Sequence, residues 1–123
     1  MILDGAHNVA GARALAATID EEFAGVAGRV LVVGMFRGKD PIEMLTALNA
    51  DRARLVVSCE PPWPRALPAS EVADAARSLG VDVEVADDVA EAVRVASAAA
   101  GADDLVLVTG SLYLVGAARA VLT

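Results

Sequence analysis

The chain has 123 residues, which is enough for one domain with a core and too few for two. Hydrophobic residues make up 56% of the sequence and aromatic residues only 3%, so Val, Leu, Ile and Ala must form the core. The net charge is −7 and no cluster of Lys or Arg is present, which disfavours nucleic acid and anionic membranes as partners. The single cysteine, Cys59, excludes an internal disulfide bond and a Cys-based zinc site, and a small buried thiol is the simpler interpretation.

Five short apolar runs have the character of buried strands. They are mostly apolar on both faces, as in a parallel sheet that is covered by helices on each side. In chain order they are Met1–Leu3, Val30–Val33, Leu55–Val57, Val81–Val85 and Leu105–Val108. The first is about three residues long, shorter than a typical strand, and this suggests a domain cut from a longer protein.

Helical patterns lie between the strands. The first helix is expected to bury a face made of Ala12, Leu15, Ala16, Ile19 and Phe23, and Asn8 is expected to cap its start. Asp40 precedes a proline and a glutamate at helix-start spacing, and Asp88 and Glu91 repeat the capping pattern. A later helix has the apolar positions Val72, Ala75, Ala76 and Leu79, after which Gly80 is placed to end it.

The alternation of strands and helices predicts one α/β domain over residues 1–123. We expect a three-layer α/β/α sandwich on a mainly parallel, doubly wound sheet. The proline-rich stretch Glu60–Pro68 is expected to be an ordered surface loop, anchored by Trp63. No cationic leader precedes an apolar segment, and the uncharged run Leu105–Ala118 is too short to span a bilayer, so the expected location is cytoplasmic.

Polar clusters follow three of the predicted strands, and each immediately precedes a helix. They are Asp4–Asn8, Arg37–Asp40 and Thr109–Ser111. Ligands of open α/β sheets bind beyond the carboxyl ends of the strands, and free N–H groups at helix starts attract anions. The three clusters therefore favour a polar ligand with negative charge.

The common nucleotide-binding fingerprints are missing from the sequence. Gly5–Gly11 does not fit G-x-G-x-x-G, and no G-x-x-x-x-G-K-[ST] motif occurs. A self-sufficient ATPase or dehydrogenase is therefore disfavoured. A phosphoacceptor receiver domain also fits poorly, because no aspartate ends the third strand.

Four segments, in order along the chain, resemble the C-terminal domain of folylpolyglutamate synthase/dihydrofolate synthase, in the Mur ligase superfamily. Leu3–Asn8 resembles the D-G/A-A-H-N element that opens that domain, and Gly34–Asp40 is similar to its G-x-x-x-D-K-D loop. Two further similar segments are Pro64–Pro68 and Thr109–Gly116. The Arg37-Gly38 pair departs from the family pattern.

The resemblance implies an ATP-dependent ligase that adds L-glutamate to dihydropteroate or a folyl(poly)glutamate through an acyl phosphate. It implies that the P-loop, the Mg²⁺ ligands and the folate site belong to a larger N-terminal domain outside this chain. By the same resemblance, Asp4 contacts ATP, and His7, Lys39 and Ser111 bind glutamate. The first and last strands should be neighbours, and an edge strand that precedes this segment in complete enzymes should be absent. The isolated segment should fold but not ligate.

Each of these residues also has a structural interpretation. Asp4 suits a turn or helix cap, His7 a hydrogen-bonded structural imidazole, and Ser111 a helix cap. Lys39 suits a solvated loop cation, and Arg37 competes with it for the glutamate carboxylate. No catalytic residue and no metal ligand is assigned to the chain.

We expect Asp4, His7, Lys39 and Ser111 to open onto one common pocket. Two other functions remain open from the sequence: the corresponding domain of a Mur-type peptidoglycan amino acid ligase, and a non-catalytic acidic α/β module that binds a protein or a small anion.

Overall fold

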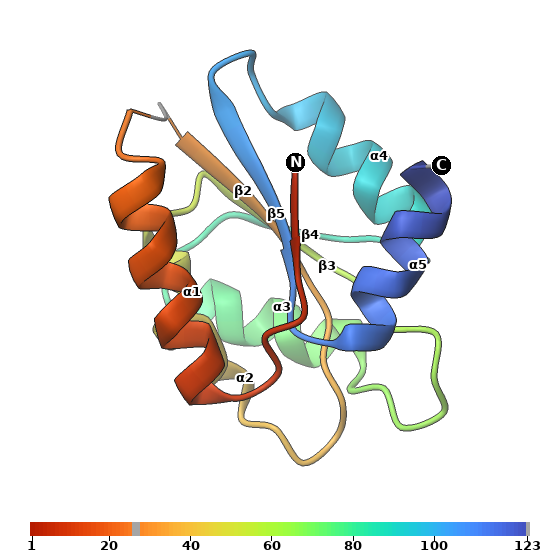
Figure 1. Ribbon diagram of the computed structural model, residues 1–123. Helices are drawn as coiled ribbons and strands as arrows, with labels where there is room; N and C mark the ends of the chain where they lie inside the picture. Colours follow the sequence, from red (N-terminus) through yellow and green to blue (C-terminus); the bar gives the residue numbers. More distant parts are fainter. Residues whose placement is uncertain (26–27, 123) are drawn as a thin grey trace.

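Five parallel strands form one sheet in the computed structural model, which describes residues 1–25 and 28–122 (Figure 1). The strands are β1 (Ile2–Asp4), β2 (Gly28–Val33), β3 (Leu55–Ser58), β4 (Val83–Val85) and β5 (Asp104–Thr109). Their spatial order is β1-β5-β2-β3-β4. The first and last strands are therefore neighbours, as predicted, with Asp4 in register with Thr109.

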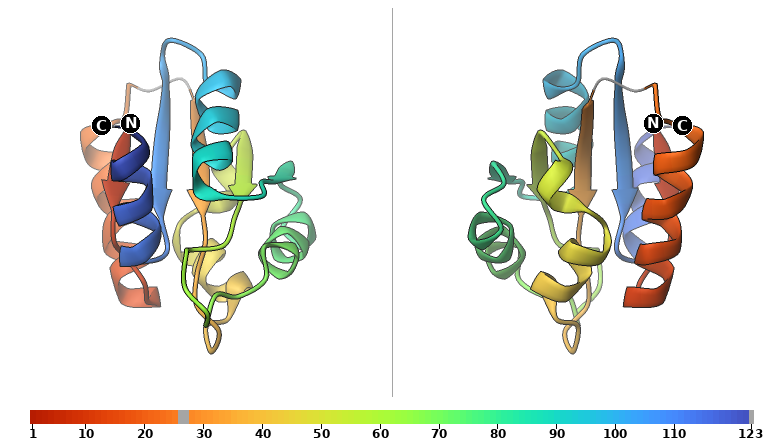
Figure 2. Two further views of the ribbon diagram at one scale, coloured as in Figure 1. Left: turned by 90° about the vertical axis from the view of Figure 1, so that its right-hand side faces the viewer. Right: turned by 90° about the vertical axis from the view of Figure 1, so that its left-hand side faces the viewer.

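Helices cover both faces of the sheet, and Figure 2 shows the two faces in turn. One layer consists of α1 (Val9–Glu22), α2 (Pro41–Ala47) and α3 (Ala69–Ser78), with a short 3-10 helix η1 (Ala50–Arg52); the other consists of α4 (Val89–Ala99) and α5 (Leu112–Leu122). Residues on β2 alternate between the two layers: Leu31 and Val33 pack towards α1–α3, and Val30 and Val32 pack towards α4 and α5. The predicted three-layer, doubly wound architecture is confirmed, with every described strand pair parallel.

The predicted helix starts and stops are also confirmed. The side chains of Asn8, Asp40 and Asp88 accept hydrogen bonds from backbone N–H groups in the first turns of α1, α2 and α4, at 2.8 to 3.3 Å. After α3, Gly80 adopts φ +79°, and the Val81 N–H donates to the Ala76 carbonyl at 3.2 Å. Local chemistry therefore sets these boundaries.

The fourth strand differs from its predicted bounds. The sequence predicts Val81–Val85, whereas the strand begins at Val83 and its last residue, Val85, is half exposed. Val81 is buried, but it belongs to the turn that ends α3. Of the five residues predicted for this edge strand, only three therefore pair with β3.

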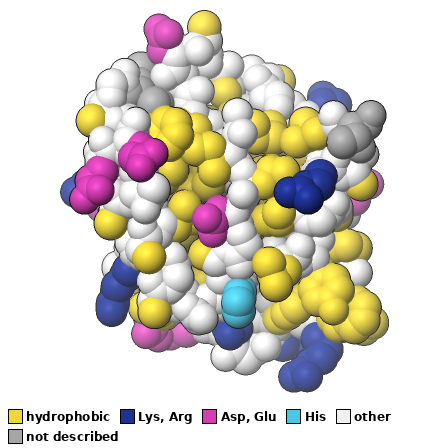
Figure 3. Space-filling view, viewed as in Figure 1, with side chains coloured by type: hydrophobic (Ala, Val, Ile, Leu, Met, Phe, Trp, Pro, Cys, Tyr) yellow, Lys and Arg dark blue, Asp and Glu magenta, His cyan; other side chains and the backbone are white. Residues whose placement is uncertain are grey.

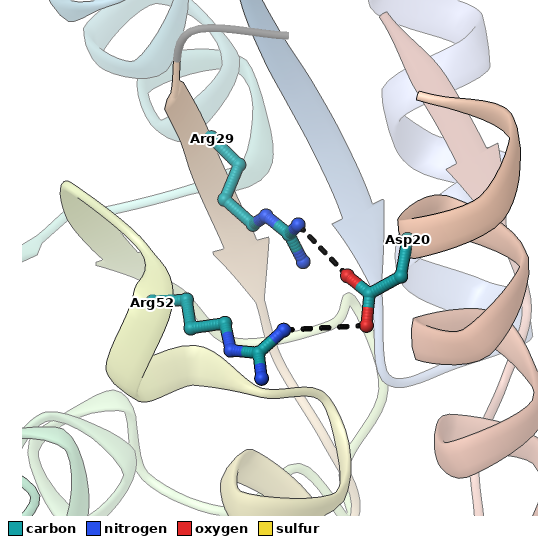
Figure 4. Close-up of polar contacts among 3 residues, drawn as sticks. All are labelled: Asp20, Arg29 and Arg52. Atoms are coloured by element: carbon teal, nitrogen blue, oxygen red, sulfur yellow. Dashed lines mark hydrogen bonds and ion pairs between the residues drawn. The ribbon is translucent and has the colours of Figure 1, made fainter. Parts of the chain in front are cut away.

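Charged side chains tie the layers together near the amino ends of the strands. Asp20 of α1 accepts hydrogen bonds from Arg29 of β2 at 3.0 Å and from Arg52 of η1 at 3.4 Å (Figure 4). Arg54, just before β3, pairs with Asp104 at the start of β5. None of the helices in the described part of the chain is long and apolar enough to cross a membrane.

Candidate functional site

The candidate site lies where the carboxyl ends of β1, β2 and β5 meet, at the lower end of the sheet in Figures 1 and 2. The loop after each strand leads directly into a helix, so the loops converge on one edge. A pocket of about 160 Å³ opens there, lined by His7, Phe36, Lys39, Gly110, Ser111, Leu112 and Tyr113. The structure thus brings together His7, Lys39 and Ser111 from three separate loops.

His7 lies in the loop between β1 and α1 and is exposed. Its Nδ1 is 3.1 Å from the carbonyl oxygen of Gly5. A proton on Nδ1 donates to that carbonyl and leaves Nε2 available to a ligand. The imidazole therefore makes a local contact, as its structural interpretation requires, and still lines the pocket.

Ser111 lies directly before α5 and is only 1% exposed. Its Oγ accepts hydrogen bonds from the backbone N–H groups of Tyr113 at 3.1 Å and Leu114 at 3.4 Å, so the residue caps the helix. Its own O–H proton remains available to donate towards the pocket.

Lys39 is half-buried in the loop between β2 and α2, directly before the cap residue Asp40. No carboxylate of the described residues forms an ion pair with its ammonium group. An unneutralised cation in a domain of net charge −7 suits a ligand carboxylate.

Asp4 does not share this pocket, and the expectation of one common pocket is wrong for this residue. It lines a separate hollow of about 310 Å³ beside α1, with Ala6, Gly11, Ala14, Leu15 and Thr18. Its Oδ1 accepts a hydrogen bond from the Ala6 N–H at 3.0 Å. The reason is that side chains along a strand alternate between the two faces of the sheet. Asp4 is on the same face as Ile2, which packs towards α1–α3, whereas the pocket includes the start of α5, on the other face.

Backbone contacts hold the three loops against one another. The Gly110 N–H donates to the Ala6 carbonyl at 3.0 Å, which joins the β5–α5 loop to the β1–α1 loop. Gly110 also has φ +113°, and a Cβ there would lie 2.3 Å from the carbonyl oxygen of Gly34 in the β2–α2 loop. Only glycine permits that approach, so the pocket walls are fixed by main chain.

An aromatic cluster at the rim of the pocket was not predicted as part of the site. The ring of Tyr113 stacks on Trp63, with centroids 4.7 Å apart and planes 21° apart, and lies 5.4 Å from the ring of Phe36. The stack connects the proline-rich loop to α5, and the role of Trp63 as the anchor of that loop stays a prediction. Leu112, which also lines the pocket, is 66% exposed. Figure 3 shows hydrophobic side chains gathered at the lower right of that face of the molecule. The only sequence signal was that three of the chain's four aromatic residues follow predicted strand ends.

A wider hollow, of about 560 Å³, lies between α1 and α2 and includes Arg13, Asp20 and Glu43. It lies between two helices of one layer, and His7, Lys39 and Ser111 do not line it, so we favour the smaller pocket, which lies at the carboxyl ends of β1, β2 and β5. Within residues 1–25 and 28–122, no group of three or more His, Cys, Asp or Glu side chains is arranged to hold a metal ion.

Comparisons with known proteins agree with this fold. The family model for the "Mur ligase, glutamate ligase domain" matches residues 1–112. The chain is 40% identical over 122 residues to a probable bifunctional folylpolyglutamate synthase/dihydropteroate synthase of Halobacterium salinarum, covering 97% of the chain and 14% of that protein.

Two solved structures extend the similarity to three dimensions. Folylpolyglutamate synthase of Mycobacterium tuberculosis complexed with ADP is 35% identical, with a TM-score of 0.85, over 95% of the chain and 28% of that protein. A bifunctional folylpolyglutamate synthase/dihydrofolate synthase with Mn, AMPPNP and L-glutamate bound is 30% identical, with a TM-score of 0.79, over 98% and 28%. The chain thus spans about a quarter of the length of these solved relatives. The matched residues and the shared fold establish that it belongs to the Mur ligase family, as a glutamate ligase domain.

Proposed function

We propose that the full-length protein is an ATP-dependent ligase that joins L-glutamate to dihydropteroate or a folyl(poly)glutamate, and that this chain supplies its glutamate site. The observation that carries the proposal is the convergence of His7, Lys39 and Ser111 on one pocket in a chain of this family. A relative of the same fold is described with AMPPNP and L-glutamate bound. L-Glutamate is one small substrate of the proposed reaction, and AMPPNP is an analogue of the other, ATP.

The proposed reaction proceeds in two steps. A carboxylate oxygen of the folate substrate attacks the γ-phosphorus of ATP, which forms an acyl phosphate and releases ADP. The amine of glutamate then attacks the acyl carbon, phosphate leaves, and the nitrogen loses a proton to give the amide. The domain's contribution is to hold glutamate so that its amine faces the acyl carbon.

The pocket residues suit a zwitterionic amino acid. The Lys39 ammonium pairs with a glutamate carboxylate, and the Ser111 hydroxyl donates a second hydrogen bond. The Nε2 atom of His7 supplies a further polar contact at the pocket wall. None of the three needs to act as a nucleophile, because the leaving phosphate already activates the acyl group.

In this proposal, Asp4 contacts the nucleotide. A carboxylate suits ribose hydroxyls and disfavours direct contact with phosphate. Because Asp4 and the three glutamate-binding residues line different hollows, the nucleotide and glutamate would occupy separate places beside the loop between β1 and α1. The ligands of the Mg²⁺ ion that accompanies ATP are proposed, from the family resemblance, to lie in the N-terminal domain outside this chain.

Two findings favour the folate reaction over the alternatives. The relatives of Halobacterium salinarum and Haloferax volcanii, at 40% and 39% identity, are both named for folylpolyglutamate synthesis rather than for peptidoglycan ligation. The solved relatives bind nucleotides, which disfavours a non-catalytic module. A cytoplasmic location is part of the proposal, because the reaction consumes ATP.

The proposal is tested by measuring ADP release from the full-length protein with ATP, L-glutamate and either dihydropteroate or tetrahydrofolate. Lys39→Ala and His7→Ala should each raise the KM for glutamate, for Lys39 by roughly 10- to 100-fold, the loss expected for one charge-assisted hydrogen bond. The KM for ATP should change much less. Arg37→Ala is the matched control for loss of a loop cation, since Arg37 does not line the pocket. Equal effects on both substrates, or no glutamate-dependent ADP release, would refute the proposal.

A further inference from the structure

Thr109, the last residue of β5, is a buried polar side chain without a partner. It is 0% exposed, and its Oγ1 has no hydrogen-bond partner within the described part of the chain. A buried hydroxyl that is left unpaired lowers stability. Because Thr109 is sealed from solvent, it cannot contact a ligand directly and can act only through a neighbouring side chain.

The sheet register identifies that neighbour. Thr109 lies opposite Asp4 on β1 and opposite Val33 on β2. On β5, Leu107 packs in the layer of α1–α3, and alternation along the strand places Thr109 on the same face. On β1, Ile2 packs in that layer too, so Asp4 also lies on this face. Of the two side chains in register with Thr109, only Asp4 is polar.

The carboxylate of Asp4 has capacity for another donor. Its Oδ1 accepts the hydrogen bond from the Ala6 N–H, and the described residues provide no other hydrogen bond to this group. An ionised carboxylate accepts up to about four hydrogen bonds, and a threonine hydroxyl can donate one. Adjacent strands are about 4.8 Å apart, so a rotation of the Asp4 or Thr109 side chain brings hydroxyl and carboxylate within reach.

We infer that Thr109 is a positioning residue for Asp4: when nucleotide binds, the Thr109 O–H donates to the Asp4 carboxylate and holds it towards the ribose. The inference rests on the proposed function, in which Asp4 contacts ATP. In the ligand-free domain the hydroxyl is unpaired, and the bound arrangement satisfies it. The new hydrogen bond therefore favours the nucleotide-bound state over the free state.

The test compares Thr109→Val, Thr109→Ser and Asp4→Asn in the full-length protein, with ADP release as the readout. Valine keeps the branched shape of threonine and removes only the hydroxyl, whereas serine keeps the hydroxyl. Thr109→Val should raise the KM for ATP about five- to tenfold, with little change in the KM for glutamate, and Thr109→Ser should restore most of the loss. Because the hydroxyl is unpaired in the free domain, Thr109→Val should not lower the melting temperature of the ligand-free protein.

A double variant checks that the effect passes through Asp4. Thr109→Val should add almost nothing to the ATP defect of Asp4→Asn, because two residues that act as a unit are not additive. If Asp4→Asn raises the KM for ATP while Thr109→Val does not, the inference fails and the proposed function stands. If Asp4→Asn leaves the KM for ATP unchanged, the nucleotide role of Asp4 fails, and the inference fails with it. Equal increases in the KM for ATP and the KM for glutamate for Thr109→Val would also overturn the inference, since they would indicate a general disturbance of the carboxyl end of the sheet.

Discussion

Replacing Gly110 by alanine tests whether main-chain contact between loops builds the pocket. The new Cβ would lie 2.3 Å from the Gly34 carbonyl oxygen, and φ of +113° is strained for any residue with a side chain. Backbone strain of this kind costs about 1–3 kcal/mol, and overpacking costs about 1–3 kcal/mol more. The reduced entropy of the unfolded chain returns roughly 0.4–1 kcal/mol. The net loss should be about 1–5.5 kcal/mol, a large share of the stability of a small domain.

Urea and thermal unfolding of the 123-residue chain measure this loss. Gly116→Ala is the matched control, because Gly116 lies inside α5 and a Cβ there meets nothing within 4 Å. The control should be stabilised by about 0.5–1 kcal/mol, so the same chemical change should have opposite signs at the two positions. If Gly110→Ala unfolds within about 0.5 kcal/mol of the unmodified chain, the loops must be able to separate at little cost, and the reasoning is wrong.

Further predictions concern residues that follow the carboxyl ends of the strands. Asp88→Ala should cost about 1 kcal/mol in urea unfolding by removing the cap of α4, whereas the neighbouring change Asp87→Ala should have almost no effect. Burial, reinforced by the charge of Asp88, raises the pKa of the Cys59 thiol to about 12, so native protein at pH 8 should resist iodoacetamide and urea-unfolded protein should react. The thiol of the unfolded chain ionises near its ordinary pKa of 9.0, whereas the thiol of the folded chain stays protonated. The free energy of unfolding should therefore fall above pH 9 by up to about 1.4 kcal/mol per pH unit. Cys59→Ala should remove the part of this pH dependence that comes from the thiol. Tyr113→Ala removes the ring that stacks on Trp63, the only tryptophan, so its fluorescence should shift to longer wavelength and acrylamide should quench it more strongly; unchanged emission would contradict the stacking.

The sequence predicted the architecture because its local signals for strands, helix caps and turns agreed with the alternation of strands and helices along the chain. Val-rich runs, cap residues such as Asn8 and Asp88, and the glycine that ends α3 all lie within a few residues of the elements that they define. The convergence of His7 and Ser111 could be anticipated because both follow parallel strands, whose carboxyl ends share one edge.

What could not be predicted depends on strand faces and on contacts between distant loops. Asp4 follows the predicted three-residue run Met1–Leu3, which is apolar on both faces, so no alternation in the sequence shows which way its carboxylate points. The aromatic cluster joins Phe36 and Trp63, from two loops, to Tyr113 in the first turn of α5, and no periodicity relates those positions. Similarly, the unpaired hydroxyl of Thr109 becomes visible only when burial is known.

Ion pairs are distributed unevenly between the two ends of the sheet. The guanidinium groups of Arg29, Arg52 and Arg54, near the amino ends of the strands, are paired, whereas Arg37, Lys39 and Arg65, on loops at the other end, form no ion pair with a described carboxylate. Helices α1 to α5 all begin at that other end, together with the carboxylates of Asp4, Asp40 and Asp88. An anionic substrate therefore meets unpaired cations only locally, beside its pocket, and rising ionic strength should slow its capture before it weakens the fold.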